Sequence, residues 1–151
     1  MPHLESAAID VLVVGPIPDF DRASGSLRFY RMLQMLAPRY RVMLLGWADA
    51  GDPRSPRYVK ALADAGLAVQ VLSRADVIDV VGAILGQVRL CVLFEFFTSA
   101  ESVLGRVRLQ RPDLPVVIDS VDLHFLREMR GVPYAMRPRL AARKARRTMR
   151  R

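Results

Sequence analysis

Five short apolar runs, each followed by a segment with helical periodicity, constrain the fold of this 151-residue chain more than any other feature. The runs are rich in Val, Ile and Leu, and the segments between them place apolar residues three and four positions apart. Strands joined by helices in this way form parallel sheets that are buried on both faces. The expected strands are residues 9–14, 42–45, 69–72, 90–94 and 116–119. Right-handed crossovers then predict an α/β fold with a doubly wound, Rossmann-like parallel sheet of about five strands.

Small residues mark the ends of several expected helices. Ser24 or Ser26 is the expected N-cap of the first helix, because a serine hydroxyl can accept a hydrogen bond from a free N–H of the first turn. Gly66 is the expected C′ residue of a short helix over residues 57–65. The single cysteine, Cys91, permits no internal disulfide and lies in an apolar run, which predicts a buried and inert thiol.

Positive charge is concentrated at the C-terminal end of the chain. From Met129 onward there are nine Lys or Arg residues and no acid, whereas residues 1–128 hold 14 basic and 15 acidic residues. This contrast predicts a Rossmann-like domain over residues 1–132 and a basic, helical tail over residues 133–151. The tail could run towards a further domain or bind an anionic membrane surface. Binding of nucleic acid is the least favoured alternative, because few aromatic residues lie among the arginines.

The chain has no segment with the pattern of a signal peptide or a membrane span. The apolar run at residues 9–14 is too short for the hydrophobic region of a signal peptide. The longest hydrophobic stretch, residues 77–97, is interrupted by Asp79, Arg89 and Glu95. We therefore expect a cytoplasmic protein, with attachment to a membrane surface as an alternative.

Polar residues follow three of the expected strands. In open α/β sheets, ligands bind beyond the carboxyl ends of the strands, near the point where the strand order reverses. After the first strand, Gly25 and Ser26 lie at a helix N-terminus, where an anion could approach the backbone; Gly25 could also merely permit a tight turn. After the fourth strand, Glu95 could bind a hydroxyl group, cap the next helix or remain in water.

The fifth expected strand ends in a stretch that contains Asp119, Asp122 and His124. A carboxylate beside an imidazole orients the ring and raises its pKa, which gives a general base or an anion-stabilising cation near neutral pH. The alternative is that both aspartates make turn and cap bonds and His124 is a surface residue. A metal site is not expected because the chain has two histidines, and no dinucleotide or P-loop motif indicates a cofactor.

Two longer stretches resemble the N-terminal half of retaining GT-B glycosyltransferases of the family-4, glycogen-synthase-type group: "DVLVVGPIPDFDRASGSLRFYRMLQMLAPRYRVMLLG" (10–46) and "PVVIDSVDLHFLREMR" (115–130). The resemblance covers essentially the whole chain as the N-terminal domain of a GT-B fold. It implies an acceptor-binding domain that works with a missing C-terminal donor domain, a nucleotide-sugar donor and an unidentified acceptor, without a metal. It also implies a truncated or split enzyme that does not transfer sugar alone, because the donor motifs would lie beyond Arg151.

The same resemblance gives each candidate residue a role. His124 would be the catalytic residue that lines the reaction centre, and Gly25 would approach the donor. The expected substrate-binding residues are Gly25, Ser26, Glu95, Asp119 and Asp122. The first hypothesis is therefore one half of a hexosyltransferase-like enzyme. The alternative is a non-catalytic Rossmann-like binding module whose basic tail binds an anionic partner.

Overall fold

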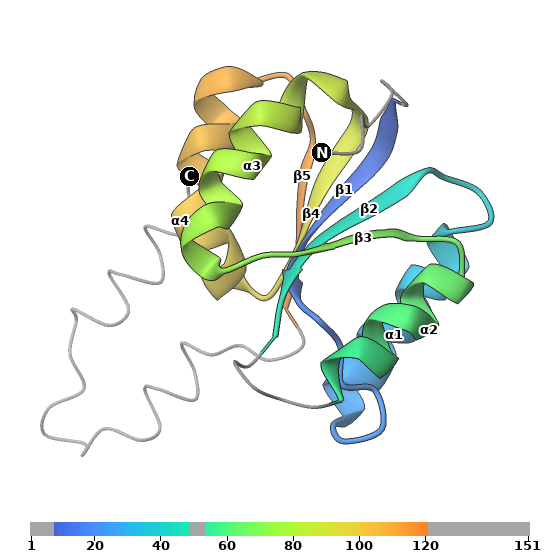
Figure 1. Cartoon of the computed structure of the whole chain (residues 1–151). Helices are drawn as coiled ribbons and strands as arrows, with labels where there is room; N and C mark the ends of the chain where they lie inside the picture. The colour runs from blue at the N-terminus through green and yellow to red at the C-terminus, as the bar shows by residue number, and fades with distance from the viewer. Residues whose placement is uncertain (1–7, 49–53, 121–151) are drawn as a thin grey trace, which may run out of the picture. The chain divides into compact units, whose positions relative to one another are not determined.

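The sheet of this protein has five strands, and all of them run parallel. A computed structural model describes residues 8–48 and 54–120 (Figure 1). The strands are β1 (Ile9–Pro16), β2 (Val42–Trp47), β3 (Ala68–Val71), β4 (Val88–Glu95) and β5 (Val116–Asp119). Their order in the sheet is β3-β2-β1-β4-β5, with parallel pairing between all neighbours. The predicted α/β fold with a doubly wound, five-stranded parallel sheet is therefore confirmed.

In residues 8–48 and 54–120, four α-helices cover the two faces of the sheet. Figure 1 shows α1 (Ser24–Leu36) and α2 (Ser55–Asp64) on one face. On the other face lie α3 (Arg74–Ile84), which continues into a short 3-10 helix, and α4 (Phe97–Gln110). Successive parallel strands are joined by crossover helices, which pack on a face of the sheet. The helices between β1 and β3 lie on one face, and those between β3 and β5 lie on the other.

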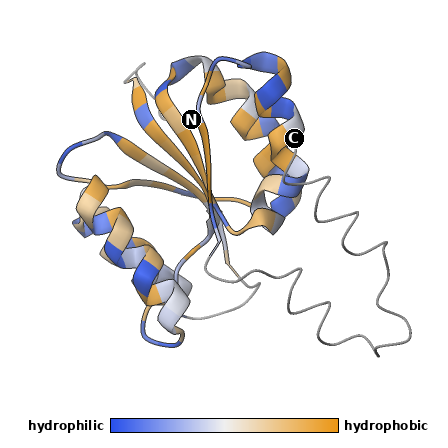
Figure 2. Cartoon of the chain, turned by 180° about the vertical axis from the view of Figure 1, so that it is seen from behind, coloured by the Kyte–Doolittle hydropathy of each residue, from blue (hydrophilic) through white to orange (hydrophobic). Residues whose placement is uncertain are grey.

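Each face of the sheet contributes its own half of the hydrophobic core. In β1, Leu12 and Val14 pack in the cluster that includes residues of α3 and α4, whereas Val11 and Val13 pack in the cluster that includes residues of α1 and α2. This alternation follows from the two-residue repeat of a strand. Figure 2 shows the result as strands that are hydrophobic along almost their whole length, as expected for a sheet buried on both sides.

Local sequence accounts for two helix ends. Gly66 follows α2 at the predicted C′ position with φ of 90°, a left-handed conformation that glycine adopts without strain. The N–H of Gly66 donates to the carbonyl of Ala63, and that of Leu67 donates to the carbonyl of Leu62, which is the Schellman pattern. The α3 helix begins after Ser73, whose hydroxyl accepts a hydrogen bond from a backbone N–H of the first turn.

The start of α1 differs from its prediction. Its N-cap is Ala23, which makes no side-chain capping bond, so neither Ser24 nor Ser26 caps the helix. Instead, the Ser26 hydroxyl donates a 2.6 Å hydrogen bond to the carboxylate of Asp19 in the preceding loop. A contact between the loop and the helix has replaced the local cap, which a pattern of nearby residues does not predict.

Two further predictions have a partial outcome. Cys91 is half-buried rather than fully buried, and its burial raises the pKa of the thiol, which keeps it in the unreactive protonated form. Among the helices of residues 8–48 and 54–120, none is long and apolar enough to cross a membrane. The expected domain boundary at residue 132 and the basic helix over residues 133–151 lie outside the described residues.

Candidate functional site

The carboxyl ends of β1 and β4 meet at the point where the strand order reverses. From β1, the sheet continues through β2 and β3 in one direction and through β4 and β5 in the other. In doubly wound sheets this switch point is where ligands bind. Gly15 lies at the end of β1, and a Cβ atom added there would lie 2.5 Å from the Cβ of Glu95 in β4. The absence of a side chain at residue 15 therefore makes room for Glu95.

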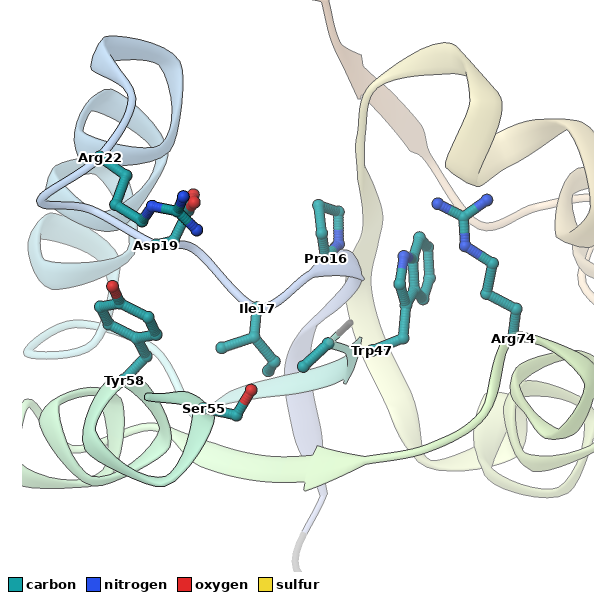
Figure 3. A pocket seen from close by; sticks show the side chains of 9 residues that line it. Pro16, Ile17, Asp19, Arg22, Trp47, Ser55, Tyr58 and Arg74 are labelled. Carbon is teal, nitrogen blue, oxygen red and sulfur yellow. The ribbon is translucent and has the colours of Figure 1, made fainter. Parts of the chain in front are cut away.

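A pocket of about 160 Å³ opens beside this point, at the carboxyl ends of β1 and β2 (Figure 3). We call it the Trp47 pocket. Its lining residues are Pro16, Ile17, Asp19, Arg22, Trp47, Ala48, Ser55, Tyr58 and Arg74. Drug-sized ligands occupy cavities of roughly 300–1,000 Å³, whereas about 150 Å³ is enough for a benzene-sized molecule. The Trp47 pocket therefore fits a small ligand or one group of a larger one.

Hydrogen-bond donors dominate one wall of the Trp47 pocket. The guanidinium of Arg74 lies 4.9 Å from the centre of the Trp47 ring, a cation–π distance (Figure 3). The indole Nε1 of Trp47 is buried and donates to no group of the described residues. Within the described part of the chain, Arg74 also forms no ion pair. A cation at the pocket, beside a buried N–H donor that has no partner among the described residues, is suited to an anionic or carbonyl-bearing ligand.

Tertiary contacts hold the opposite wall, the loop between β1 and α1. The Ile17 N–H donates to the carbonyl of Trp47 at 2.8 Å, which attaches the loop to the end of β2. The Tyr58 hydroxyl of α2 donates to Asp21 at 2.6 Å, and the ring of Phe20 packs on both Tyr30 and Tyr58. The loop and the Tyr58 side chain, which lines the pocket, are thus held in place by aromatic packing and by hydrogen bonds, the preorganisation that a binding site needs.

An acidic cluster lies on the other side of β1, formed by Glu95, Asp119 and Arg28; we call it the Glu95 cluster. Glu95 is 1% exposed, and its Oε2 has no hydrogen-bond partner. It pairs across the sheet with Asp119 of β5, whose carboxylate forms an ion pair with Arg28 of α1. Burial, and then the negative charge of Asp119, raise the pKa of Glu95 to about 8, while Arg28 opposes this rise. At neutral pH Glu95 is therefore a neutral acid that can donate a hydrogen bond.

The backbone next to Glu95 is strained. Phe96 has φ of 64° and ψ of 150°, in a region that residues with a side chain rarely adopt. Such conformations cost about 1–3 kcal/mol and gather at binding and switch regions. The Phe96 N–H donates to the carbonyl of Asp119 at 2.9 Å, so the strained residue also ties β4 to β5. The hydroxyl of Ser99 in the next helical turn is buried without a partner.

The structure brings together several residues that the sequence singled out. Gly25 and Ser26 lie in the first turn of α1, and Glu95 and Asp119 are paired neighbours at the ends of β4 and β5. All four lie near the carboxyl-terminal edge of the sheet, where the topology rule placed them. The predicted residues Asp122 and His124 lie outside the described residues.

Sequence reasoning missed Trp47 and Arg74. The predicted strand ends at residue 45, whereas β2 continues to Trp47, and Arg74 is the first residue of α3, after β3. The segments that follow β2 and β3 lie side by side because these strands are neighbours in the sheet, so the strand order would have indicated that Trp47 and Arg74 are close. No group of three His, Cys, Asp or Glu residues that could hold a metal is found in residues 8–48 and 54–120.

Comparisons with known proteins show no family for this chain. No family model matches the chain. No curated protein matches it either. Among solved structures, a match is the crystal structure of a universal stress protein in complex with cAMP, at 17% sequence identity and a TM-score of 0.44. The match covers 76% of this chain and 99% of that chain.

The glycosyltransferase assignment is therefore wrong. The matched structure is a universal stress protein rather than a glycosyltransferase, and no glycosyltransferase family model matches the chain. The nucleotide-sugar donor and the missing donor domain, which followed from the same resemblance, are corrected with it. The physical reason is that both quoted stretches are dominated by strand, turn and helix signals, which many Rossmann-like folds share without sharing chemistry.

Proposed function

We propose that this chain is a Rossmann-like binding module and that the Trp47 pocket takes a small anionic ligand. The observation that carries the proposal is the pairing of the Arg74 guanidinium with the Trp47 ring, beside an indole N–H that has no acceptor. A buried donor left without an acceptor costs about 1–3 kcal/mol. A ligand oxygen that displaced the atoms burying Trp47 Nε1 and accepted from this N–H would remove this cost while its negative charge faces Arg74.

The remaining lining residues indicate what else the ligand carries. Arg22 offers a second cation at the opposite wall, and Asp19, Ser55 and Tyr58 offer oxygen atoms. A phosphate or carboxylate group with a neighbouring hydroxyl would match these groups in sign and in hydrogen-bonding type. The volume of about 160 Å³ leaves room for such a group and little more.

The anion-binding role expected for the basic residues 133–151 lies outside the described residues and stays a prediction, as does the expected cytoplasmic location. The roles expected for Gly25, Ser26, Glu95 and Asp119 also stay predictions. Of these residues, Ser26 is connected to the Trp47 pocket through its hydrogen bond to Asp19.

Trp47 provides a direct assay because it is the single tryptophan of the chain. We expect sulfate, inorganic phosphate or AMP to change its fluorescence in a saturable manner, and calorimetry to give one binding site. Arg74→Met should remove the binding. Arg39→Met is the matched control, because Arg39 is an exposed arginine just before β2, at the opposite edge of the sheet from the pocket.

Two results would overturn the proposal. One is the absence of saturable binding of all three probes up to about 10 mM, which corresponds to a binding free energy of about 3 kcal/mol. The other is equal binding by the wild type and by Arg74→Met, which would place the ligand elsewhere.

A further inference from the structure

The Glu95 cluster is joined to the Trp47 pocket through the first two turns of α1. Arg28 of this helix pairs with Asp119 of the cluster. Two residues earlier, Ser26 donates a 2.6 Å hydrogen bond to Asp19, and Asp19 lines the pocket. A displacement of the start of α1 would therefore change both the ion pair and one wall of the pocket.

Glu95 is the buried group that can change charge in this arrangement. In the described part of the chain, Asp119 of β5 and Arg28 of α1 are the charged groups whose electrostatic effects reach it, one raising and one lowering its pKa. From β1, Gly15 contributes no side chain, and from α4 the neutral Ser99 is buried. While Glu95 is neutral, Arg28 has one carboxylate partner, and after ionisation it has two that compete for it.

The observed packing gives Oε2 of an ionised Glu95 no hydrogen-bond donor among the described residues. This oxygen is buried, and a Cβ atom at Gly15 would lie 2.5 Å from Cβ and 3.4 Å from Cγ of Glu95. A charged carboxylate in such surroundings must gain a cation or water, because the desolvation of a charge is far more costly than that of a neutral acid. Among the described residues, Arg28, whose side chain is 48% exposed, is the cation whose charge acts on Glu95.

We propose that Glu95 is a proton-controlled latch on the start of α1: its neutral form keeps the Arg28–Asp119 pair and the Asp19 wall in place, and its ionised form displaces them. The proton is released to solvent, and no other covalent change takes place. The strained Phe96, which follows Glu95 directly, gives this segment a conformation that can relax when the latch opens. The effect on the Trp47 pocket rests on the proposed function, whereas the latch itself does not.

The latch is tested without any ligand by NMR on the full chain. The side-chain Nε–H signal of Arg28 and the carboxyl carbon of Glu95 are followed from about pH 6 to about pH 10, a range in which ordinary carboxyl groups do not titrate. Both signals should change together near pH 8, the pKa of Glu95. In Glu95→Gln the Arg28 signal should stay constant. Glu101→Gln, which changes an exposed carboxylate of α4, the helix that follows β4, should behave like the wild type.

The latch is refuted if Glu95 titrates in the ordinary acidic range, or if it ionises near pH 8 while the Arg28 signal does not change. Should Glu95→Gln fail to fold, Asp119→Asn provides a second test. It removes a carboxylate that raises the pKa of Glu95 and leaves Arg28 free to pair with it, so the transition should move to lower pH. An unchanged transition in Asp119→Asn would contradict the proposed cluster.

The link to the pocket is tested with sulfate, whose charge is constant over this range. Sulfate affinity, measured by Trp47 fluorescence, should fall about tenfold between about pH 7 and about pH 9 in the wild type, a coupling of ordinary size, and should stay constant in Glu95→Gln. Equal affinity at both pH values in the wild type refutes the link. If sulfate does not bind at any pH while Arg28 and Glu95 titrate together, the latch stands and the pocket assignment fails.

Discussion

Replacing Glu95 by glutamine is expected to raise the free energy of unfolding, and the gain should grow with pH. The pKa of Glu95 is about 8 in the folded protein, compared with an ordinary value of 4.5. Between these values the folded protein holds a proton that the unfolded chain has released, so the free energy of unfolding falls as pH rises. The contribution of the neutral acid is fully present below pH 4.5 and is lost as pH rises through about 8.

The size of the effect follows from the same two pKa values. Glutamine cannot ionise, so the variant and the wild type differ little below pH 4.5, where both side chains are neutral. At pH 7 the variant should be more stable by at most about 3 kcal/mol, and above pH 8 by at most about 5 kcal/mol. Both figures are upper bounds because the wild type can relax to bring water or Arg28 to the ionised carboxylate.

Urea unfolding, followed by the fluorescence of Trp47, measures this difference. It is carried out at several pH values for the wild type, for Glu95→Gln and for the exposed control Glu101→Gln. The control should follow the wild type at every pH. A gain in Glu95→Gln that is the same at pH 5 and at pH 8 would show that the substitution acts through packing, and would refute the reasoning from charge.

Four further substitutions have expected outcomes that unfolding experiments can measure. Gly15→Ala should destabilise the protein by about 1–3 kcal/mol, because the new methyl group would meet the Cβ of Glu95 at 2.5 Å; Gly105→Ala, which meets no atom within 4 Å, should instead stabilise α4 by up to about 1 kcal/mol. Tyr58→Phe should cost about 1–2 kcal/mol by removing its hydrogen bond to Asp21 in the loop between β1 and α1, and hydrogen exchange of that loop should become faster. Ser73→Ala should cost about 1 kcal/mol and increase fraying at the start of α3, and an unchanged midpoint would show that the cap contributes nothing.

Local sequence patterns predicted the strands because each one is a short apolar run between helical segments. The boundaries moved where partners on other strands decide them. Residues 90–94 were expected as a strand, but β4 runs from Val88 to Glu95, since Val88 pairs with β1 and Glu95 pairs with β5. Glutamate is depleted in strands, so the sequence alone does not predict that Glu95 belongs to β4. The pairing of Glu95 with Asp119 of β5 decides this, and the sequence does not show that pairing.

The candidate site was predictable only in part for the same reason. Glu95 and Asp119 stand directly after apolar runs, and the rule for parallel sheets places both near one edge. The Trp47 pocket needs the strand order, because Arg74 lies 27 positions after Trp47 and reaches it only because β3 is the neighbour of β2. The raised pKa of Glu95 was also invisible in the sequence, since it depends on burial and on the charge of Asp119.

The choice of a carboxyl group at residue 95 is itself an argument for a role beyond packing. A disadvantage of about 3 kcal/mol relative to an amide is a large share of the 5–15 kcal/mol that usually separates folded from unfolded domains. Gly15 is fitted to the same side chain, because no larger residue leaves room for Glu95. Glutamine would fill the space with the same shape and without this disadvantage. What a carboxyl group alone can do there is release a proton close to neutral pH, and the residue that would respond, Arg28, lies within the same cluster.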